Sequence, residues 1–204
     1  EVDKYQQLRY MTLDATGCQL EFQVPAQCPW MWNHDTLRGP VKGAVGLRGS
    51  GRELPSDFAV AVRPPAPGCT ASVSTEYTLP PGASGRLVFS KGHLHVGGLS
   101  VSAYVMRGGE NRTEPTALPG ELLCSCSARY GQSGPGEAGV VGDELGYVVA
   151  VSTCSFAERG KQPILRSGDR IRVEATYRTD LWFNGVMGLL DLAILPDSGG
   201  DLLV

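Results

Sequence analysis

Short apolar or alternating segments, separated by stretches rich in glycine and proline, recur along most of the chain. In Ala71 to Tyr77, small or apolar residues alternate with polar ones, which is typical of a β-strand with one buried face. Leu189 to Leu195 is apolar almost throughout, which favours a strand buried on both faces. The predicted strands are residues 18–24, 58–62, 71–77, 86–90, 99–106, 147–152, 171–177 and 189–195.

Helices are not expected, because the 27 glycines and 14 prolines interrupt most candidate segments before a third turn. The pattern therefore predicts an all-β protein, an antiparallel β-sandwich of about eight or more strands. Two stretches look irregular, residues 29–55 and 129–146. We predict a single domain over residues 1–195 with an insertion around 29–55, followed by a tail or linker at 196–204.

The composition excludes several classes of protein. Hydrophobic residues make up 42% and charged residues 19% of the chain, so it can bury a core and is not a disordered tail. No apolar run approaches the roughly 20 residues that a membrane-spanning helix needs. The formal net charge is -3, and the basic residues are scattered rather than clustered, which argues against nucleic acid as a partner.

The cysteines and one sequon point to an exported protein. The six cysteines form no paired Cys-x-x-Cys pattern, so disulfides are favoured over a zinc site. Asn111-Arg112-Thr113 is a glycosylation sequon in a polar stretch, so Asn111 is expected to carry a glycan if the source is eukaryotic. The sequence starts at Glu1 without a signal peptide, and we expect a targeting segment to have been removed. The cysteines are Cys18, Cys28, Cys69, Cys124, Cys126 and Cys154.

Two of the three histidines stand at i and i+2 in Gly92-His93-Leu94-His95-Val96. On a strand this spacing puts both imidazoles on one face, where they can bind one metal ion. Such pairs also occur as polar residues on a solvated face, so the spacing alone does not decide between the two. His34 could reach a metal from another segment, although an ordinary loop residue is the simpler interpretation.

Met187, in Gly185-Val186-Met187-Gly188, is the third candidate ligand. By itself it is better explained as a core methionine. A thioether beside two imidazoles would make a soft site that favours copper, especially Cu(I). Because imidazoles take up protons near pH 6.5, such a site is expected to lose its metal in mild acid. We identify no catalytic residue, since no serine lies in a Gly-x-Ser-x-Gly setting.

From Leu87 to Leu195 the order of motifs resembles the C-terminal part of the stress up-regulated Nod19 family of secreted plant proteins. The resemblance implies that Cys154 pairs with Cys124 or Cys126 across the glycine-rich loop, which would contribute on the order of 3 kcal/mol. The other member of that pair would then join Cys18, Cys28 and Cys69. The matching motifs are His93 to Gly98, Cys124 or Cys126 with Tyr130-Gly131, Asp143 to Tyr147, Ser152 to Cys154, and Gly185 to Gly188.

The same order resembles the second domain of the copper type II, ascorbate-dependent monooxygenases. That resemblance implies a jelly-roll sandwich in which His93, His95 and Met187 hold the copper. There are two departures from it. Phe183 stands where the family often has histidine, and this sequence contains no counterpart of the electron-supplying copper domain.

Two functions follow as hypotheses. The first is a secreted copper-binding domain with a possible redox role, which if active would be a monooxygenase-like oxidoreductase. The second is a non-catalytic extracellular or cell-surface module that contacts other proteins or glycans and keeps a vestigial metal site.

Overall fold

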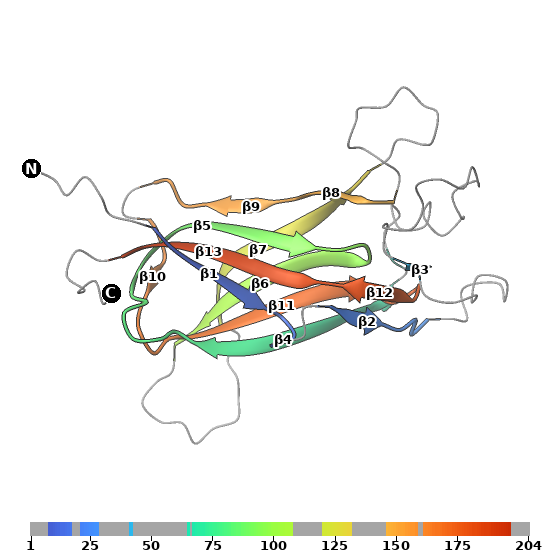
Figure 1. The fold of residues 1–204 in the computed structure, drawn as a ribbon, viewed down its shortest axis with the longest axis horizontal. Coiled ribbons are helices and arrows are strands. Elements are labelled where there is room, and N and C mark those ends of the chain that lie inside the picture. The colour runs from blue at the N-terminus through green and yellow to red at the C-terminus, as the bar shows by residue number, and fades with distance from the viewer. Residues whose placement is uncertain are drawn as a thin grey trace, which may run out of the picture.

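A computed structural model describes residues 8–17, 21–28, 41–42, 65, 67–107, 120–131, 146–158 and 161–196. Within these ranges every regular element is a strand (Figure 1), and no helix is long and apolar enough to cross a membrane. The strands are β1 (Arg9–Asp14), β2 (Phe22–Val24), β3 (Val41–Lys42), β4 (Thr70–Thr78), β5 (Gly85–Leu94), β6 (Gly98–Met106), β7 (Glu121–Tyr130), β8 (Val148–Val151), β9 (Thr153–Ser155), β10 (Ile164–Leu165), β11 (Arg170–Arg178), β12 (Phe183–Val186) and β13 (Gly188–Pro196).

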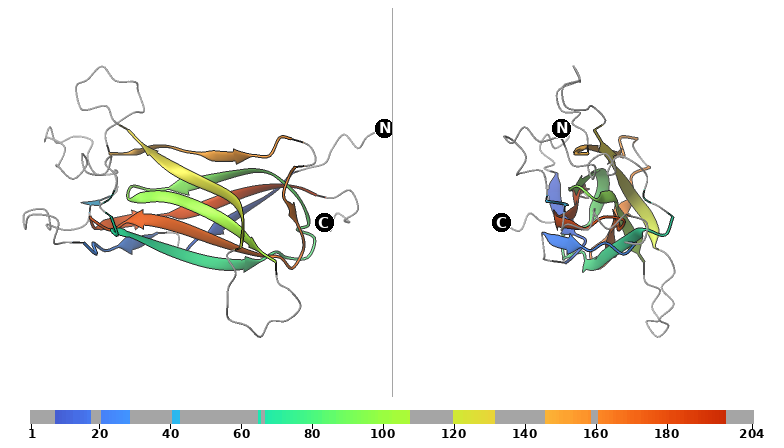
Figure 2. Two further views of the ribbon diagram at one scale, coloured as in Figure 1. Left: turned by 180° about the vertical axis from the view of Figure 1, so that it is seen from behind. Right: turned by 90° about the vertical axis from the view of Figure 1, so that its right-hand side faces the viewer.

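Two five-stranded sheets form a β-sandwich, which confirms the predicted fold class. The first sheet has the order β1-β13-β5-β10, with β9 also paired to β5, and the second has the order β4-β11-β6-β7-β8. Their strands run along the long axis of the molecule (Figures 1 and 2). A small third sheet, β2-β12-β3, contains a parallel pair, β12 with β3, whereas the other pairings are antiparallel.

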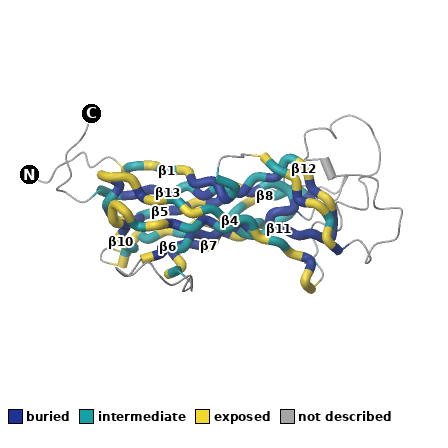
Figure 3. The backbone as a smooth tube through the Cα atoms, turned by 90° about the horizontal axis from the view of Figure 1, so that it is seen from below, coloured by how far each residue is buried: buried dark blue, intermediate teal, exposed yellow. Residues whose placement is uncertain are grey.

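The core lies between the two large sheets, because alternate residues of each strand point inward. In β11, Ile171, Val173 and Ala175 are fully buried, and the residues between them are half-buried. Buried and exposed positions alternate along the strands in Figure 3. β13 lies between β1 and β5 and buries Leu190, Leu192 and Ile194. Its other positions include Leu189, Asp191 and Leu195, which are only half-buried, so the prediction of burial on both faces is met on one face alone.

Most predicted strands match an observed one, with boundaries that move by a few residues. Of residues 18–24, only 22–24 form a strand in the described part of the chain, and residues 58–62 lie outside it. The expectation that 129–146 is irregular is wrong for Arg129 and Tyr130, which end β7. Val41–Lys42 forms β3 within the predicted insertion, and Pro196 closes β13 rather than opening a tail.

Two disulfides are present, Cys28–Cys69 and Cys124–Cys154, each with Cα atoms 5.9 Å apart. The second joins β7 to β9 and therefore links the two large sheets, and it is one of the two pairings that the family resemblance implied. The expectation that Cys126 would form a disulfide within the set of Cys18, Cys28 and Cys69 is wrong. Cys28 and Cys69 pair with each other, and Cys126 is a buried free thiol, while Cys18 lies outside the described residues.

Candidate metal centre

The two candidate histidines lie at the end of β5. His93 is the last residue but one of the strand and is exposed, whereas His95 follows the strand and is half-buried. The predicted geometry requires both histidines to lie in the strand, but β5 ends at Leu94, and Val96 and Gly97 already form a turn. The rings nevertheless lie together, with centroids 5.1 Å apart and planes at 68°.

Met187 immediately precedes β13, the neighbour of β5. In the antiparallel register His93 faces Leu189 and Leu94 faces Gly188, so one further step would set Met187 opposite His95. Directly opposed residues of two paired strands point to the same face. The three predicted ligands therefore come from adjoining ends of two paired strands. Met187 is half-buried.

A backbone carbonyl orients the His95 ring. Nδ1 of His95 lies 2.6 Å from the carbonyl oxygen of Gly185, which can only accept, so Nδ1 carries the proton. Nε2 of the neutral ring then keeps its lone pair for a metal ion, the arrangement found in many metal-binding histidines. Gly185 has φ of +68° and lies at a register shift in the β12–β2 pair, which directs its carbonyl toward β5.

The surroundings favour a neutral His93. Although His93 is exposed, partial desolvation of its ring lowers its pKa below the ordinary value. The neighbouring His95 and Lys91 lower the pKa further, whereas the carboxylate of Asp191 raises it. Asp191 accepts a hydrogen bond of 2.6 Å from the Thr12 hydroxyl. A neutral imidazole is the form that binds a metal ion.

The turn after His95 is tied by hydrogen bonds to two strands. The Tyr130 hydroxyl accepts a hydrogen bond from Gly97 N at 2.9 Å and donates one to Gly98 O at 2.8 Å. Arg178 N donates to Gly97 O at 2.9 Å, and Gly98 N donates to His95 O at 3.0 Å. These bonds fix the backbone beside His95 to β7 and β11.

Phe183 packs directly on this turn. Gly97 has φ of +95°, and a Cβ built on it would lie 2.6 Å from Cγ of Phe183. The Phe183 side chain is 1% exposed, so the ring closes the turn from the side of β12. The aromatic residue that departs from the copper enzymes' pattern is therefore a packing partner of the turn.

Replacing Tyr130 by phenylalanine is expected to destabilise the fold by about 1–3 kcal/mol, because two buried backbone groups lose their partner. Burial raises the pKa of Tyr130 to about 12, whereas an unfolded tyrosine titrates near pH 10. The folded pKa is the higher one, so this stabilisation is complete below about pH 10 and is lost as the pH rises toward 12. Urea unfolding curves between pH 8 and 11 measure both effects.

Tyr177 provides the control for this experiment. Its hydroxyl is buried without a hydrogen-bond partner among the described residues, so Tyr177→Phe is expected to leave stability unchanged or to increase it. Burial also raises the pKa of Tyr177, so both tyrosines contribute to the pH dependence of stability in the wild type. The contribution of Tyr130 is therefore obtained by subtracting the pH dependence of Tyr130→Phe from that of the wild type. Equal stabilities for the two variants would show that the Tyr130 hydroxyl does not hold the turn.

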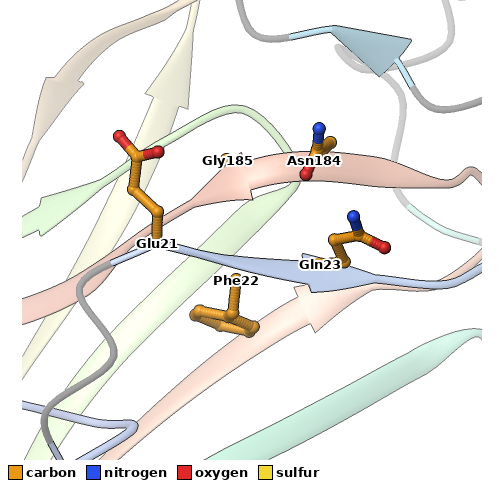
Figure 4. A pocket seen from close by; sticks show the side chains of 5 residues that line it. All are labelled: Glu21, Phe22, Gln23, Asn184 and Gly185. Carbon is orange, nitrogen blue, oxygen red and sulfur yellow. The ribbon is translucent and has the colours of Figure 1, made fainter.

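A shallow polar pocket adjoins Gly185, whose carbonyl oxygen accepts the hydrogen bond from His95. It is lined by Glu21, Phe22, Gln23, Asn184 and Gly185. Figure 4 shows the polar side chains of Glu21, Gln23 and Asn184 on one side of the β2–β12 pair and the Phe22 ring on the other. The Phe22 ring contacts Tyr177 edge-on at 5.2 Å. Gly185 thus contributes to the pocket and also holds His95.

A family model described as Stress up-regulated Nod 19 matches residues 59–196, about two thirds of the chain. The chain belongs to this family. The region matched to Nod 19 contains both histidines, Met187 and the Cys124–Cys154 disulfide. The match confirms the resemblance to the Nod 19 family that the order of motifs indicated. No curated protein matches the sequence.

Sequence reasoning identified the histidines and Met187 but missed the groups that hold them. The Gly185 carbonyl and the Tyr130 hydroxyl both lie in motifs already noted, Gly-Val-Met-Gly and Tyr-Gly. A role for them could have been suspected from those motifs, but not the contacts themselves. His34 and Asn111 lie outside the described residues.

Proposed function

We propose that this protein is a secreted copper-binding domain that holds one ion with His93, His95 and Met187. The observation that carries the proposal is the His95 ring, which donates from Nδ1 to the Gly185 carbonyl and leaves Nε2 for a metal beside the His93 ring. The register of β5 and β13 supports Met187 as the third ligand.

The proposed donor set determines which ion is preferred. Two imidazoles and a thioether are soft enough to favour copper over calcium or magnesium, and the thioether favours the Cu(I) state. Copper bound there would supply one-electron redox chemistry, as expected from the resemblance to the monooxygenase scaffold. The chain's own residues orient His95, keep His93 neutral and fix the turn between them and β6.

Export is the second element of the proposal. Disulfides persist in oxidising compartments, and two are present among the described residues, one of which links the two large sheets. The Asn111 sequon supports the same location, outside the cell or on its surface. Other extracellular proteins or glycans are then the available macromolecular partners.

Removing the histidines is expected to weaken Cu(I) binding at least tenfold for each imidazole lost. The test titrates metal-free protein with Cu(I) against a chromogenic chelator, with ascorbate as the reductant because it leaves disulfides closed. Wild type is compared with His93→Ala, His95→Ala, the double variant and Met187→Leu. Arg86→Ala, at an exposed position near the start of β5, is the matched control and should bind as wild type does.

If wild type binds Cu(I) no more tightly than the double histidine variant, the copper proposal is wrong. The second hypothesis, a non-catalytic extracellular module with a vestigial site, would then stand. If only Met187→Leu binds normally, the ion is held by the two imidazoles alone.

A further inference from the structure

Three cysteine sulfurs gather between the two sheets, away from the histidine pair. The sulfur atoms of Cys124, Cys126 and Cys154 all lie within 4.8 Å of one another. Cys124 and Cys126 are two residues apart on β7 and so share a face, and Cys154 reaches them from β9. Cys124 is 2% exposed and Cys126 is fully buried, whereas Cys154 is half-buried, so the cluster of soft ligands is shielded from the side of β7 and reached from the side of β9.

This cluster lies on the opposite face of β5 from His93. Gly92 of β5 is buried and faces Cys126, since a Cβ on Gly92 would lie 2.8 Å from Cβ of Cys126. His93, the next residue, points outward and is exposed. Because consecutive residues of a strand point to opposite faces, the sulfur cluster and the histidine pair are separate sites on one strand.

The free thiol is not aligned for attack on the disulfide. Cys126 Sγ lies 3.4 Å from Cys124 Sγ, which is bonded to Cys154. Thiol–disulfide exchange needs the three sulfurs nearly in line. In such a line the 3.4 Å contact and an S–S bond of ordinary length would add up, so the sulfurs of Cys126 and Cys154 would be roughly 5.5 Å apart. Since all three lie within 4.8 Å of one another, they form a triangle instead.

A triangle of sulfurs suits a three-coordinate soft metal ion. Metal–sulfur bonds of about 2.3 Å place the sulfurs of such a site about 4 Å apart. Thiolates bind both Cu(I) and zinc, but Cu(I) accepts three ligands where a structural zinc ion takes four. Among the described residues, the cluster of His, Cys, Asp and Glu suited to a metal contains these three cysteines and no fourth member.

We propose that Cys124, Cys126 and Cys154 form a second, redox-controlled Cu(I) site, available when the Cys124–Cys154 disulfide is reduced. An external dithiol supplies two electrons and two protons to the disulfide and is itself oxidised to a disulfide. The three thiols then bind Cu(I) as thiolates and release their protons. The disulfide and the metal ion are therefore alternatives at Cys124 and Cys154.

The expected result is one additional Cu(I) per chain after reduction. The experiment uses the full chain with His93→Ala and His95→Ala, so that the first site cannot contribute, and with Cys28→Ser and Cys69→Ser, so that reduction opens only the Cys124–Cys154 disulfide. Oxidised protein should bind no Cu(I) tightly. Protein reduced with a phosphine should bind one ion, with a thiolate-to-Cu(I) absorption band in the near ultraviolet and three sulfur neighbours by X-ray absorption.

Cys126→Ser is the decisive variant, because it removes one ligand and does not affect the Cys124–Cys154 disulfide of the oxidised protein. Its reduced form should bind Cu(I) at least tenfold more weakly and with fewer sulfur neighbours. Cys18→Ser, which removes a thiol outside the described residues, is the matched control and should bind normally.

Equal Cu(I) affinity for reduced protein with and without Cys126→Ser overturns the proposal, since the ion would then be held elsewhere. So does a reduced chain that unfolds and is not restored by Cu(I), because metal binding at a site formed only by the fold must stabilise that fold. Neither result affects the histidine site, which is tested in oxidised protein.

Discussion

Replacing Asp180 by alanine is expected to lower the free energy of unfolding by about 3–5 kcal/mol, because it leaves a buried guanidinium without its carboxylate. Arg178 Nε donates to Asp180 Oδ1 at 2.7 Å, and Arg178 Nη2 donates to Oδ2 at 2.6 Å. The two side chains are 1% and 2% exposed, so water cannot replace the lost partner. Urea unfolding at neutral pH measures the change.

A surface ion pair provides the control for Asp180→Ala. Arg170 and Glu76 lie 3.1 Å apart, with side chains 49% and 41% exposed. Glu76→Ala is therefore expected to change stability by less than about 1 kcal/mol. The double variant Arg178→Met with Asp180→Ala should recover much of the loss, since neither charge of the pair remains. A similar effect of Asp180→Ala and Glu76→Ala would show that the buried pair does not support the fold.

The strands could be predicted where apolar residues at inward-facing positions alternate with polar residues at outward-facing ones. β4 and β11 were found in this way, because one face of each packs in the core. β7 was missed, because two of its three buried positions are Cys124 and Cys126, which alternate with serines and carry little hydrophobic pattern. β10 and β12 have only two and four residues, which is too short to establish a period.

The candidate ligands could be predicted because their spacing is local, whereas their supports are not. The His-x-His spacing lies within one segment of sequence, and the family resemblance adds Met187. The bond from His95 to the Gly185 carbonyl spans 90 residues, and those from Tyr130 to the turn span 32 and 33 residues. Such pairings arise from sheet register and bulges, which no local pattern encodes.

The same turn connects the fold to the proposed copper site. Arg178, held by Asp180, donates its backbone N–H to Gly97, and the Tyr130 hydroxyl bridges Gly97 and Gly98. Gly98 in turn donates to the His95 carbonyl. A change at the turn is therefore expected to affect both stability and the orientation of His95.

Gly97→Ala is expected to lower the free energy of unfolding by about 2–5 kcal/mol. A left-handed backbone costs an alanine about 1–2 kcal/mol, and the added methyl group would overlap the Phe183 ring, which costs a further 1–3 kcal/mol or so. Gly168→Ala is the matched control. Its φ of +87° is similar to the +95° of Gly97, but no atom lies within 4 Å of the new Cβ, so only the backbone cost applies.

The Gly97 variant should also bind Cu(I) at least tenfold more weakly, because displacing the turn moves His95 from the Gly185 carbonyl, whereas Gly168→Ala should bind normally. Adding Phe183→Leu to Gly97→Ala relieves the overlap and should restore part of the stability, which a double-mutant cycle detects as coupling. If the two glycine variants lose equal stability and no coupling to Phe183 is found, the ring does not constrain the turn. If Gly97→Ala destabilises the fold but leaves Cu(I) affinity unchanged, the turn supports the sandwich without positioning His95.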